Sequence, residues 1–163
     1  MKIFDIMETP IGELRIEEEN GYITKIGVLR PGLDDETIPR ESGKLIERCK
    51  RELAEYFAGE RTKFTIPLNP VGTSFMLHVW EELKCIKYGE VISYKELAER
   101  IGNPKAVRAV GGANSKNKLI IVIPCHRVIG ANGAMTGYGG GGIHNKELLL
   151  EHEKNSLEKL CGK

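Results

Sequence analysis

The sequence predicts a mixed α/β (α+β) fold in two domains, a small antiparallel-sheet domain over residues 1–72 and a mainly helical domain over residues 73–163. Two observations support this division. The beginning of the chain alternates short apolar and polar runs separated by turn residues, which is typical of antiparallel strands. Beyond Pro70-Val71-Gly72, which we interpret as the join, apolar residues recur at helical spacing and helix-capping residues become frequent.

Three short strands are expected to open the chain as a β-meander. The Asn20-Gly21 pair is typical of a tight turn between antiparallel strands, and Gly12 marks the turn before it. The expected strands cover residues 2–9, 12–20 and 22–30.

An amphipathic helix is expected next, from Ser42 to Ala58. Leu45, Cys49 and Leu53 share one face of it, so Cys49 is expected in the core. Gly59 suits the end of this helix. A further strand is expected over residues 63–69, before the join.

The second domain is expected to begin with three helices. Thr73 or Ser74 suits the start of the first, which we expect to end near Tyr88-Gly89. Residues 93–96, Ser-Tyr-Lys-Glu, fit a capping box that opens a second helix, closed by Gly102.

Asn103 and Pro104 suit the start of the third helix, which is expected to run to about Gly112. Two short helices joined by a turn of about two residues are compatible with a helix-turn-helix, in which the second helix faces DNA. Many other helical hairpins share this spacing.

The third helix contains RAVGGA, residues 108–113, in which one long cation stands among mostly small side chains. Small side chains allow close approach to a DNA groove, and an arginine is able to enter the base stack in place of a displaced base. The alternative is that Gly111-Gly112 ends the helix and Arg108 forms a surface ion pair.

Cys125 follows the apolar run LIIVI, residues 119–123, which we expect to be a buried strand stopped by Pro124. A thiol at the end of a core strand is held rigidly, and His126 and Arg127 beside it favour the thiolate, which is the nucleophile. The alternative is an inert packed cysteine beside a surface histidine. A closing helix is expected over residues 145–154, with Leu148, Leu149 and His152 facing inward.

Charge is distributed unevenly although the net charge is only +1. The segment from Arg100 to Lys146 contains seven basic and no acidic residues, so the rest of the chain is net acidic. A basic segment around a candidate nucleophile indicates an anionic partner such as nucleic acid.

Cysteine spacing and hydropathy exclude several classes. The four cysteines form no CxxC or nearby CxxH pair, so neither a zinc site nor a disulfide framework is expected. No apolar run approaches the length of a membrane span and no leader is evident, so a soluble cytoplasmic protein without a membrane partner is expected.

Together, these motifs resemble the methylated-DNA protein-cysteine methyltransferase (O6-alkylguanine-DNA alkyltransferase) family. The resemblance is carried by PCHRV at 124–128, GEVISYKELA at 89–98 and NPKAVRAVGGAN at 103–114, and it extends over about residues 73–155. It implies a ribonuclease H-like N-terminal domain and a winged-helix/helix-turn-helix C-terminal domain that holds the reactive cysteine.

The implied activity is direct reversal of DNA damage. An O6-alkylated guanine in double-stranded DNA, and also O4-alkylated thymine, is flipped out from the minor groove and transfers its alkyl group irreversibly to Cys125. The protein then acts once, as a monomer, and needs no cofactor and no metal. Two other functions stay open: a non-catalytic binder of alkylated DNA and a cysteine hydrolase.

The resemblance also implies roles for individual residues. Cys125 is the nucleophile, His126 takes its proton through a water, Glu153 orients His126, and Asn117 braces the turn before the apolar run. The implied DNA contacts are Arg108, which replaces the extruded base, together with Tyr94, Ala109, Gly111, Ala113 and Arg127. The implied base contacts are the carbonyls of Cys125 and Val128 with the guanine amino group, and Tyr138 and the Gly139 amide with the alkylated oxygen.

Simpler interpretations stay open for some of these residues. Tyr94 could be a surface residue at a helix start, Tyr138 a turn aromatic and Asn117 a loop cap. The chain also departs from the family pattern. Lys118-Leu119-Ile120 stands where relatives often have prolines, and the loop after Tyr138 is one glycine longer.

Overall fold

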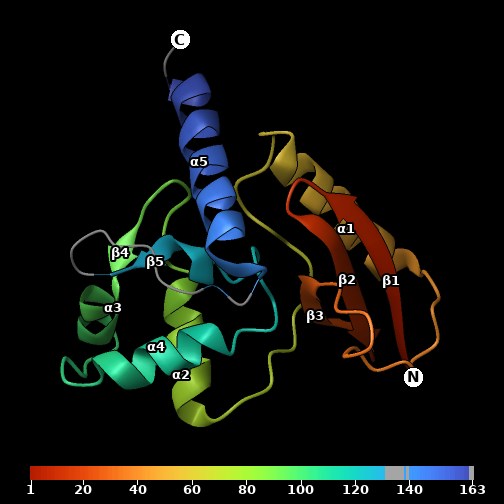
Figure 1. Cartoon of the computed structure of the whole chain (residues 1–163), viewed down its shortest axis with the longest axis horizontal. Helices are drawn as coiled ribbons and strands as arrows, with labels where there is room; N and C mark the ends of the chain where they lie inside the picture. Colours follow the sequence, from red (N-terminus) through yellow and green to blue (C-terminus); the bar gives the residue numbers. More distant parts are fainter. Residues whose placement is uncertain (131–137, 139, 162–163) are drawn as a thin grey trace. The chain divides into compact units, whose positions relative to one another are not determined.

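The computed structural model describes residues 1–130, 138 and 140–161, with side chains described as far as residue 159. The described chain forms two compact units, Met1–Pro70 and Val71–Lys163, and the join lies within two residues of the expected position. Figure 1 shows a sheet with one helix in the first unit and helices around a very short sheet in the second. The turn expected at residues 131–133 lies outside the described residues.

The N-terminal unit is the expected β-meander. Strands β1 (Lys2–Thr9), β2 (Gly12–Glu19) and β3 (Tyr22–Val28) pair in sequence order, and each pair is antiparallel. Asn20 and Gly21 both have positive φ, 53° and 83°, as the turn between β2 and β3 requires. The predicted meander is therefore confirmed.

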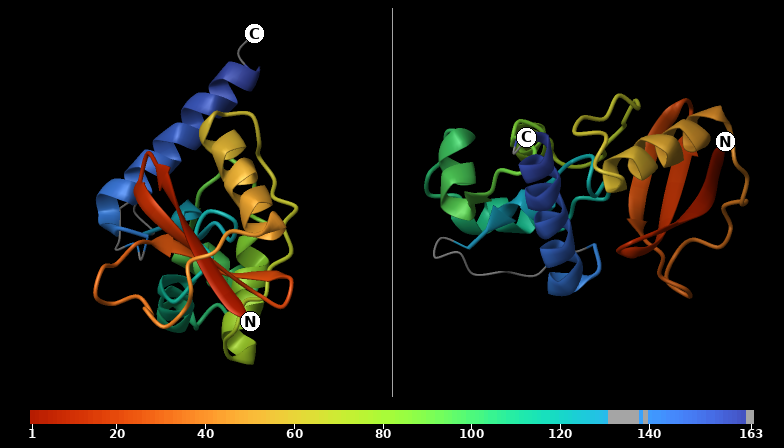
Figure 2. Two further views of the ribbon diagram at one scale, coloured as in Figure 1. Left: turned by 90° about the vertical axis from the view of Figure 1, so that its right-hand side faces the viewer. Right: turned by 90° about the horizontal axis from the view of Figure 1, so that it is seen from above.

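Helix α1 (Lys44–Phe57) packs against all three strands and covers one face of the sheet (Figure 2). The core of this unit consists of side chains from β2, β3 and α1 that are fully buried: Leu14, Ile16, Ile23, Ile26, Ile46, Cys49, Leu53 and Tyr56. Cys49 therefore belongs to the core, as the amphipathic pattern predicted.

The strand predicted over residues 63–69 is wrong. This segment runs beside β3 and forms one isolated bridge between Ile23 and Leu68, with backbone bonds from Ile23 N to Pro67 O and from Asn69 N to Ile23 O. A proline has no amide hydrogen to donate, so Pro67 cannot extend the ladder and the pairing stays local.

The described residues of the C-terminal unit form four α-helices, one 3₁₀ turn and a two-stranded parallel sheet. Thr73 caps helix α2 (Ser74–Leu83) by accepting from Met76 N, and Ser93 caps helix α3 (Tyr94–Arg100) by accepting from Glu96 N, as predicted. The elements are α2 (Ser74–Leu83), β4 (Ile92–Ser93), α3 (Tyr94–Arg100), α4 (Val107–Ser115), a 3₁₀ turn (Cys125–Arg127), β5 (Val128–Ile129) and α5 (Gly142–Cys161).

Helices α3 and α4 form the predicted helix pair, and α4 also packs against α2. The connection is longer than predicted, because α4 begins at Val107, with Ala106 as its N-cap, instead of at Pro104 after Asn103. The Asn103 carbonyl accepts from Ala106 N in a turn, so residues 101–106 are not helical. The helix continues through Gly111-Gly112 to Ser115, so the alternative that these glycines end it is wrong.

The strand predicted over residues 119–123 is also wrong, although the segment is buried. Ile121 has a φ of 72°, and backbone bonds from Val122 N to Ile120 O and from Ile123 N to Leu119 O close a tight turn. Asn117 also supplies bonds that a neighbouring strand would otherwise provide, because Oδ1 accepts from Leu119 N and Nδ2 donates to Ile123 O. An apolar run indicates burial but does not distinguish a strand from a packed turn.

Helix α5 is longer than predicted, and of the three residues expected to face inward only Leu149 is fully buried. Lys146, Leu149 and Glu153 are fully buried, whereas Leu148 and His152 are only half-buried. The spacing of three and then four residues places the buried three on one side of the helix. This stripe is polar at two of three positions, so the apolar pattern could not identify it.

The Glu153 carboxylate joins several parts of the C-terminal unit. Oε1 accepts from Arg127 Nε at 2.8 Å and from Gly89 N at 3.2 Å. Oε2 bonds His126 Nε2 at 2.6 Å and accepts from Arg127 Nη2 at 3.0 Å. Arg127 also donates to Ile86 O at 2.7 Å. The carboxylate therefore holds α5 to the 3₁₀ turn and to the segment between α2 and β4.

Burial by itself would raise the pKa of Glu153, but the bonds and charges of His126 and Arg127 hold this pKa below its ordinary value. We therefore expect Glu153→Gln to lower the free energy of unfolding of the C-terminal unit by about 3 kcal/mol at pH 7, since it leaves Arg127 buried without its counter-ion. Trp80, the single tryptophan, is buried in this unit and reports its unfolding by fluorescence in denaturant.

The matched control is Glu151→Gln, an exposed position on the same helix, which should leave stability within about 0.5 kcal/mol of the wild type. The stabilisation from Glu153 is present above its unfolded pKa and is lost as the pH falls through its lower folded pKa. The difference between wild type and Glu153→Gln should therefore shrink in acid. A difference that is small at pH 7, or that grows in acid, would contradict this role.

Candidate active site

Cys125 begins the 3₁₀ turn and is held by two asparagines, Asn114 in the last turn of α4 and Asn117 just after that helix. Asn117 Nδ2 donates to Ile123 O at 2.8 Å, and Asn114 Nδ2 donates to Cys125 O at 3.3 Å. These two carbonyls flank Pro124, so the backbone on both sides of the proline is fixed. The Asn117 side chain also acts to lower the pKa of the Cys125 thiol. The expected bracing by Asn117 is therefore visible as geometry.

Cys125 is 4% exposed, and burial of its thiol raises the pKa to about 11, although the Asn117 side chain and the charge of Lys146 act in the opposite direction. The resting side chain is therefore a thiol at neutral pH. The expectation that His126 and Arg127 favour the thiolate is wrong, because the positive charge of Arg127 is compensated by Glu153 and His126 is neutral. Attack by Cys125 needs a base.

His126 is suited to act as that base. It is fully buried, and this burial lowers the pKa of the imidazole even though the hydrogen bond with Glu153 opposes the effect. Nε2 is bonded to Glu153, whereas Nδ1 is buried without a hydrogen-bond partner among the described residues. If Nε2 carries the ring proton, Nδ1 is the free acceptor.

Tyr138 lies beside this pair, with its ring centroid 6.5 Å from that of His126. Its side chain is 7% exposed, and Oη has no hydrogen-bond partner among the described residues. Burial raises the Tyr138 pKa well above its ordinary value, and the nearby acidic groups of Cys125 and Glu153, which are negative when ionised, raise it further. The phenol therefore stays protonated and is able to donate. Gly139, the expected neighbour in this role, lies outside the described residues.

Gly140 packs directly against Tyr138. A Cβ at residue 140 would lie 2.5 Å from the Tyr138 ring, closer than real contacts allow. The backbone of this segment is fixed further by bonds from Gly142 N to Tyr138 O at 2.8 Å and from Asn145 Nδ2 to Gly140 O at 2.8 Å. The absence of a side chain at Gly140 therefore allows the tyrosine ring to occupy its place.

Lys146 is a buried cation that sequence reasoning missed. Its Nζ donates to Val128 O at 2.6 Å and lies 5.9 Å from the centroid of the Tyr94 ring. Burial lowers the Lys146 pKa, and the charge of Cys125 counteracts this. Nothing local in the sequence marks Lys146, because a lysine on a helix is usually exposed. Asn114 was missed in the same way, since its neighbours suggested only a DNA-facing helix.

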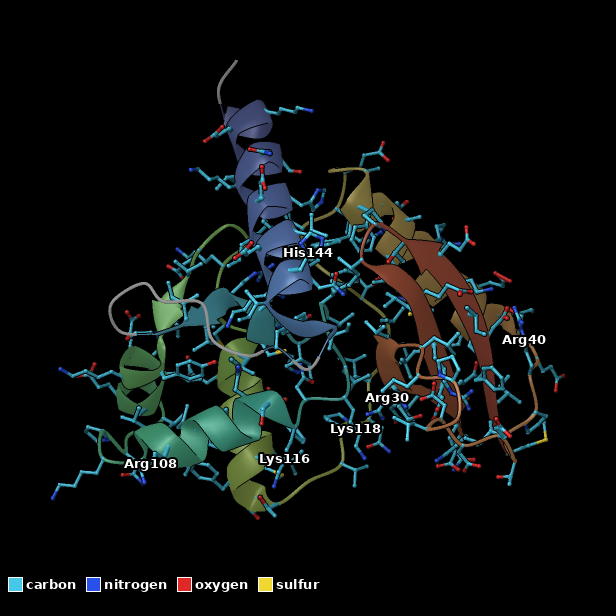
Figure 3. All side chains as sticks on the ribbon, viewed as in Figure 1. Arg30, Arg40, Arg108, Lys116, Lys118 and His144 are labelled. Atoms are coloured by element: carbon cyan, nitrogen blue, oxygen red, sulfur yellow. The ribbon has the colours of Figure 1, made fainter. Side chains whose placement is uncertain are left out.

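The expected DNA contacts divide between the surface and the interior. Arg108 and Ala109 are exposed on α4, Gly111 is half-buried, and Tyr94 at the start of α3 is half-buried. Figure 3 shows Arg108 on α4, with Lys116 and Lys118 just beyond the end of that helix. Exposed basic side chains therefore lie on α4 and just beyond its end.

Ala113 and Arg127 do not lie on that surface. Ala113 is 3% exposed and its carbonyl accepts from Trp80 Nε1 at 2.9 Å, while Arg127 is 6% exposed in the Glu153 network. The expectation that Ala113 and Arg127 contact DNA is therefore wrong, because both residues are buried. The helix continues past Gly112, so Ala113 lies on its buried side together with Val110 and Asn114, a side that the sequence pattern did not mark.

Among residues 1–130, 138 and 140–159, no group of three or more histidine, cysteine, aspartate and glutamate side chains is arranged to hold a metal ion. In the same part of the chain no helix has the length and apolar character needed to cross a membrane. The described cysteines Cys49, Cys85 and Cys125 are all free.

Two family models match nearly the whole chain. Residues 3–70 match the ribonuclease-like domain of 6-O-methylguanine DNA methyltransferase, and residues 74–155 match its DNA binding domain. The constitutive methylated-DNA–protein-cysteine methyltransferase of Bacillus subtilis (strain 168) is 46% identical over 165 residues, covering 98% of this chain and 99% of that protein. The corresponding protein of Mycobacterium leprae is 43% identical over 153 residues, covering 93% and 92%.

Solved structures agree with these matches. The Mycobacterium tuberculosis OGT structure in complex with DNA superposes with a TM-score of 0.86 at 42% identity, covering 94% of each chain. The O6-methylguanine methyltransferase structure of the same organism gives a TM-score of 0.87 at 41% identity, covering 96% of this chain and 94% of that one. The resemblance predicted from PCHRV and RAVGGA is confirmed, and the chain belongs to the methylated-DNA–protein-cysteine methyltransferase family.

Proposed function

We propose that the protein repairs O6-alkylguanine in double-stranded DNA by moving the alkyl group to Cys125 in a single irreversible turnover. The observation that carries this proposal is the arrangement of Cys125, His126 and Glu153: a buried nucleophile beside a neutral imidazole whose other nitrogen is held by a carboxylate. The relatives named above are cysteine methyltransferases, which favours this chemistry over hydrolysis. O4-alkylthymine is proposed as a second substrate.

In the proposed reaction, Cys125 Sγ bonds to the alkyl carbon as the bond from that carbon to O6 breaks, and the electron pair stays on O6. The thiol proton passes through a water to His126 Nδ1, the buried nitrogen with no partner among the described residues. Glu153 holds the imidazole in orientation and balances the charge it gains. The departing guanine anion takes up a proton and leaves.

Tyr138 is proposed to stabilise the charge that develops on O6. Its Oη is buried, protonated and without a partner among the described residues, and the Gly139 amide is proposed to assist. Lys146, fully buried beside Tyr94 and Val128, adds a positive charge that favours the reacting sulfur as it loses its proton. The product is a thioether, which water does not cleave, so the protein is consumed.

DNA is proposed to bind on the surface of α3 and α4. Arg108 would enter the stack in place of the extruded base, the small residues Ala109 and Gly111 would allow α4 to approach the minor groove, and Tyr94 would contact the flipped nucleotide. The proposed catalytic side chains all come from one unit of one chain, which supports action as a monomer. A reducing compartment such as the cytoplasm suits the free thiol.

Mass spectrometry tests the proposed acceptor. We expect one equivalent of a DNA duplex containing O6-methylguanine to add one CH₂ unit of mass to the peptide that contains Cys125, because a methyl group replaces the thiol proton. Cys125→Ser should show no added mass. If the lesion is bound while this peptide stays unmodified, the protein is a non-catalytic binder of damaged DNA.

The pH dependence of the single-turnover rate tests the proposed base. Since burial raises the Cys125 pKa to about 11 and lowers the His126 pKa below 6.5, the neutral imidazole is present throughout pH 7 to 9. We expect a rate that is constant over this range and falls below pH 6.5 as His126 becomes protonated. A rate that rises about tenfold per pH unit from 7 to 9 would indicate free thiolate attack and contradict the role of His126.

Arg108→Ala tests the proposed finger. An exposed arginine that fills the gap in the stack should matter only when a base leaves a duplex, and unstacking costs a few kcal/mol. We therefore expect reaction with the duplex to slow about 100-fold, while reaction with free O6-methylguanine base changes less than about twofold. Arg51→Ala, at an exposed arginine of α1, is the control. Equal slowing on both substrates would exclude this role.

A further inference from the structure

Asn114 lies one residue before the end of α4 and turns its side chain into the protein. Asn114 is only 5% exposed, whereas Arg108 on the same helix is exposed. Nδ2 donates to Cys125 O at 3.3 Å, and Oδ1 is buried without a hydrogen-bond partner among the described residues. One half of this amide is therefore engaged at the nucleophile, and the other half is an unused acceptor.

The bond to Cys125 determines which atom of the amide is which. Amide oxygen and nitrogen atoms are assigned from their hydrogen bonds, and an oxygen placed against the Cys125 carbonyl would be repelled. Nδ2 therefore faces that carbonyl and Oδ1 faces away from it. The unused acceptor is fixed in position by the bond that the donor half makes.

The two backbone carbonyls expected to bind the guanine amino group already have donors. Cys125 O accepts from the Val128 amide, which closes the 3₁₀ turn, and from Asn114 Nδ2, so both of its lone pairs are used. Val128 O accepts from Lys146 Nζ at 2.6 Å. Asn114 Oδ1 lies in the same amide that contacts Cys125 O and remains unsatisfied.

A buried acceptor without a donor is unfavourable, and a ligand that supplies the donor recovers that free energy. Enzymes that extrude a base recognise its Watson–Crick edge by hydrogen bonds. On that edge, guanine carries an exocyclic amino group with two hydrogens, and an O6-alkylated guanine keeps them. This amino group is therefore able to supply the hydrogen-bond donor that the buried Asn114 Oδ1 lacks.

We propose that Asn114 Oδ1 accepts a hydrogen bond from the exocyclic amino group of the extruded guanine, which makes Asn114 a specificity-determining residue. This inference rests on the proposed function and adds a base contact to it. Asn114 also belongs to the helix that carries Arg108, so the residue that fills the gap in the DNA and the residue that recognises the extruded base are fixed to one element.

The test compares two lesions in the same duplex: O6-methylguanine and O6-methylhypoxanthine, which lacks only the amino group. Single-turnover rates are measured for the wild type and for Asn114→Leu, which is close to asparagine in size but has no polar atom. Loss of one hydrogen bond to a buried group corresponds to about a tenfold change in rate. We expect the wild type to prefer O6-methylguanine about tenfold and the variant to lose this preference by reacting more slowly with O6-methylguanine alone.

Asn114→Ala serves as a second variant in case the leucine disturbs packing, and Trp80 fluorescence reports whether either variant is folded. Asn103→Ala, at an exposed position in the turn before α4, is the control and should keep the wild-type preference. A merely structural role for Asn114 would slow both lesions equally, and that result would overturn the proposal.

The wild type alone supplies a further test. If it reacts equally fast with both lesions, no acceptor for the amino group is functioning and the proposal is overturned without any variant. If it transfers no methyl group from either lesion, the proposed function itself fails, so failure of the function and failure of the Asn114 assignment give different results.

Discussion

The C-terminal unit depends on one fully buried carboxylate. Glu153 receives bonds from Arg127, His126 and the Gly89 amide, so a single side chain ties α5 to the 3₁₀ turn and to the segment that precedes β4. A buried charge is costly unless it is paired and hydrogen-bonded, and here both carboxylate oxygens have donors. The same contact that closes the fold also orients the imidazole, so stability and reactivity have a common origin.

Burial has opposite effects on the two groups of the proposed reaction. It keeps the Cys125 thiol protonated, with a pKa of about 11, and it keeps the His126 imidazole neutral. Both groups are therefore uncharged at neutral pH, and in the proposed reaction the proton moves only when an electrophilic carbon is in place. The charge of Lys146 and the Asn117 side chain assist the sulfur, and neither of them removes its proton in advance.

The sequence predicted what depends on local pattern or on a specific motif. The meander, the capping of α2 and α3, and the family followed from residues such as Asn20-Gly21, Thr73 and PCHRV. It failed where conformation depends on distant partners. The run 119–123 is a turn because Asn117 binds its backbone, and α4 begins three residues later than its capping signal suggested because residues 103–106 close a turn of their own. The burial of Lys146 and the pairing of Glu153 with His126 have no local signature, and only the resemblance suggested the second.

The glycines after Tyr138 have unequal constraints, although in the sequence they look like a uniform flexible run. Gly141 and Gly142 have φ values of 110° and 85°, so they are set by backbone conformation, whereas Gly140 is set by the tyrosine ring that fills the space of its missing side chain. For protein engineering, this segment is therefore a set of separate steric requirements, and a generic glycine-serine linker of equal length would not reproduce them.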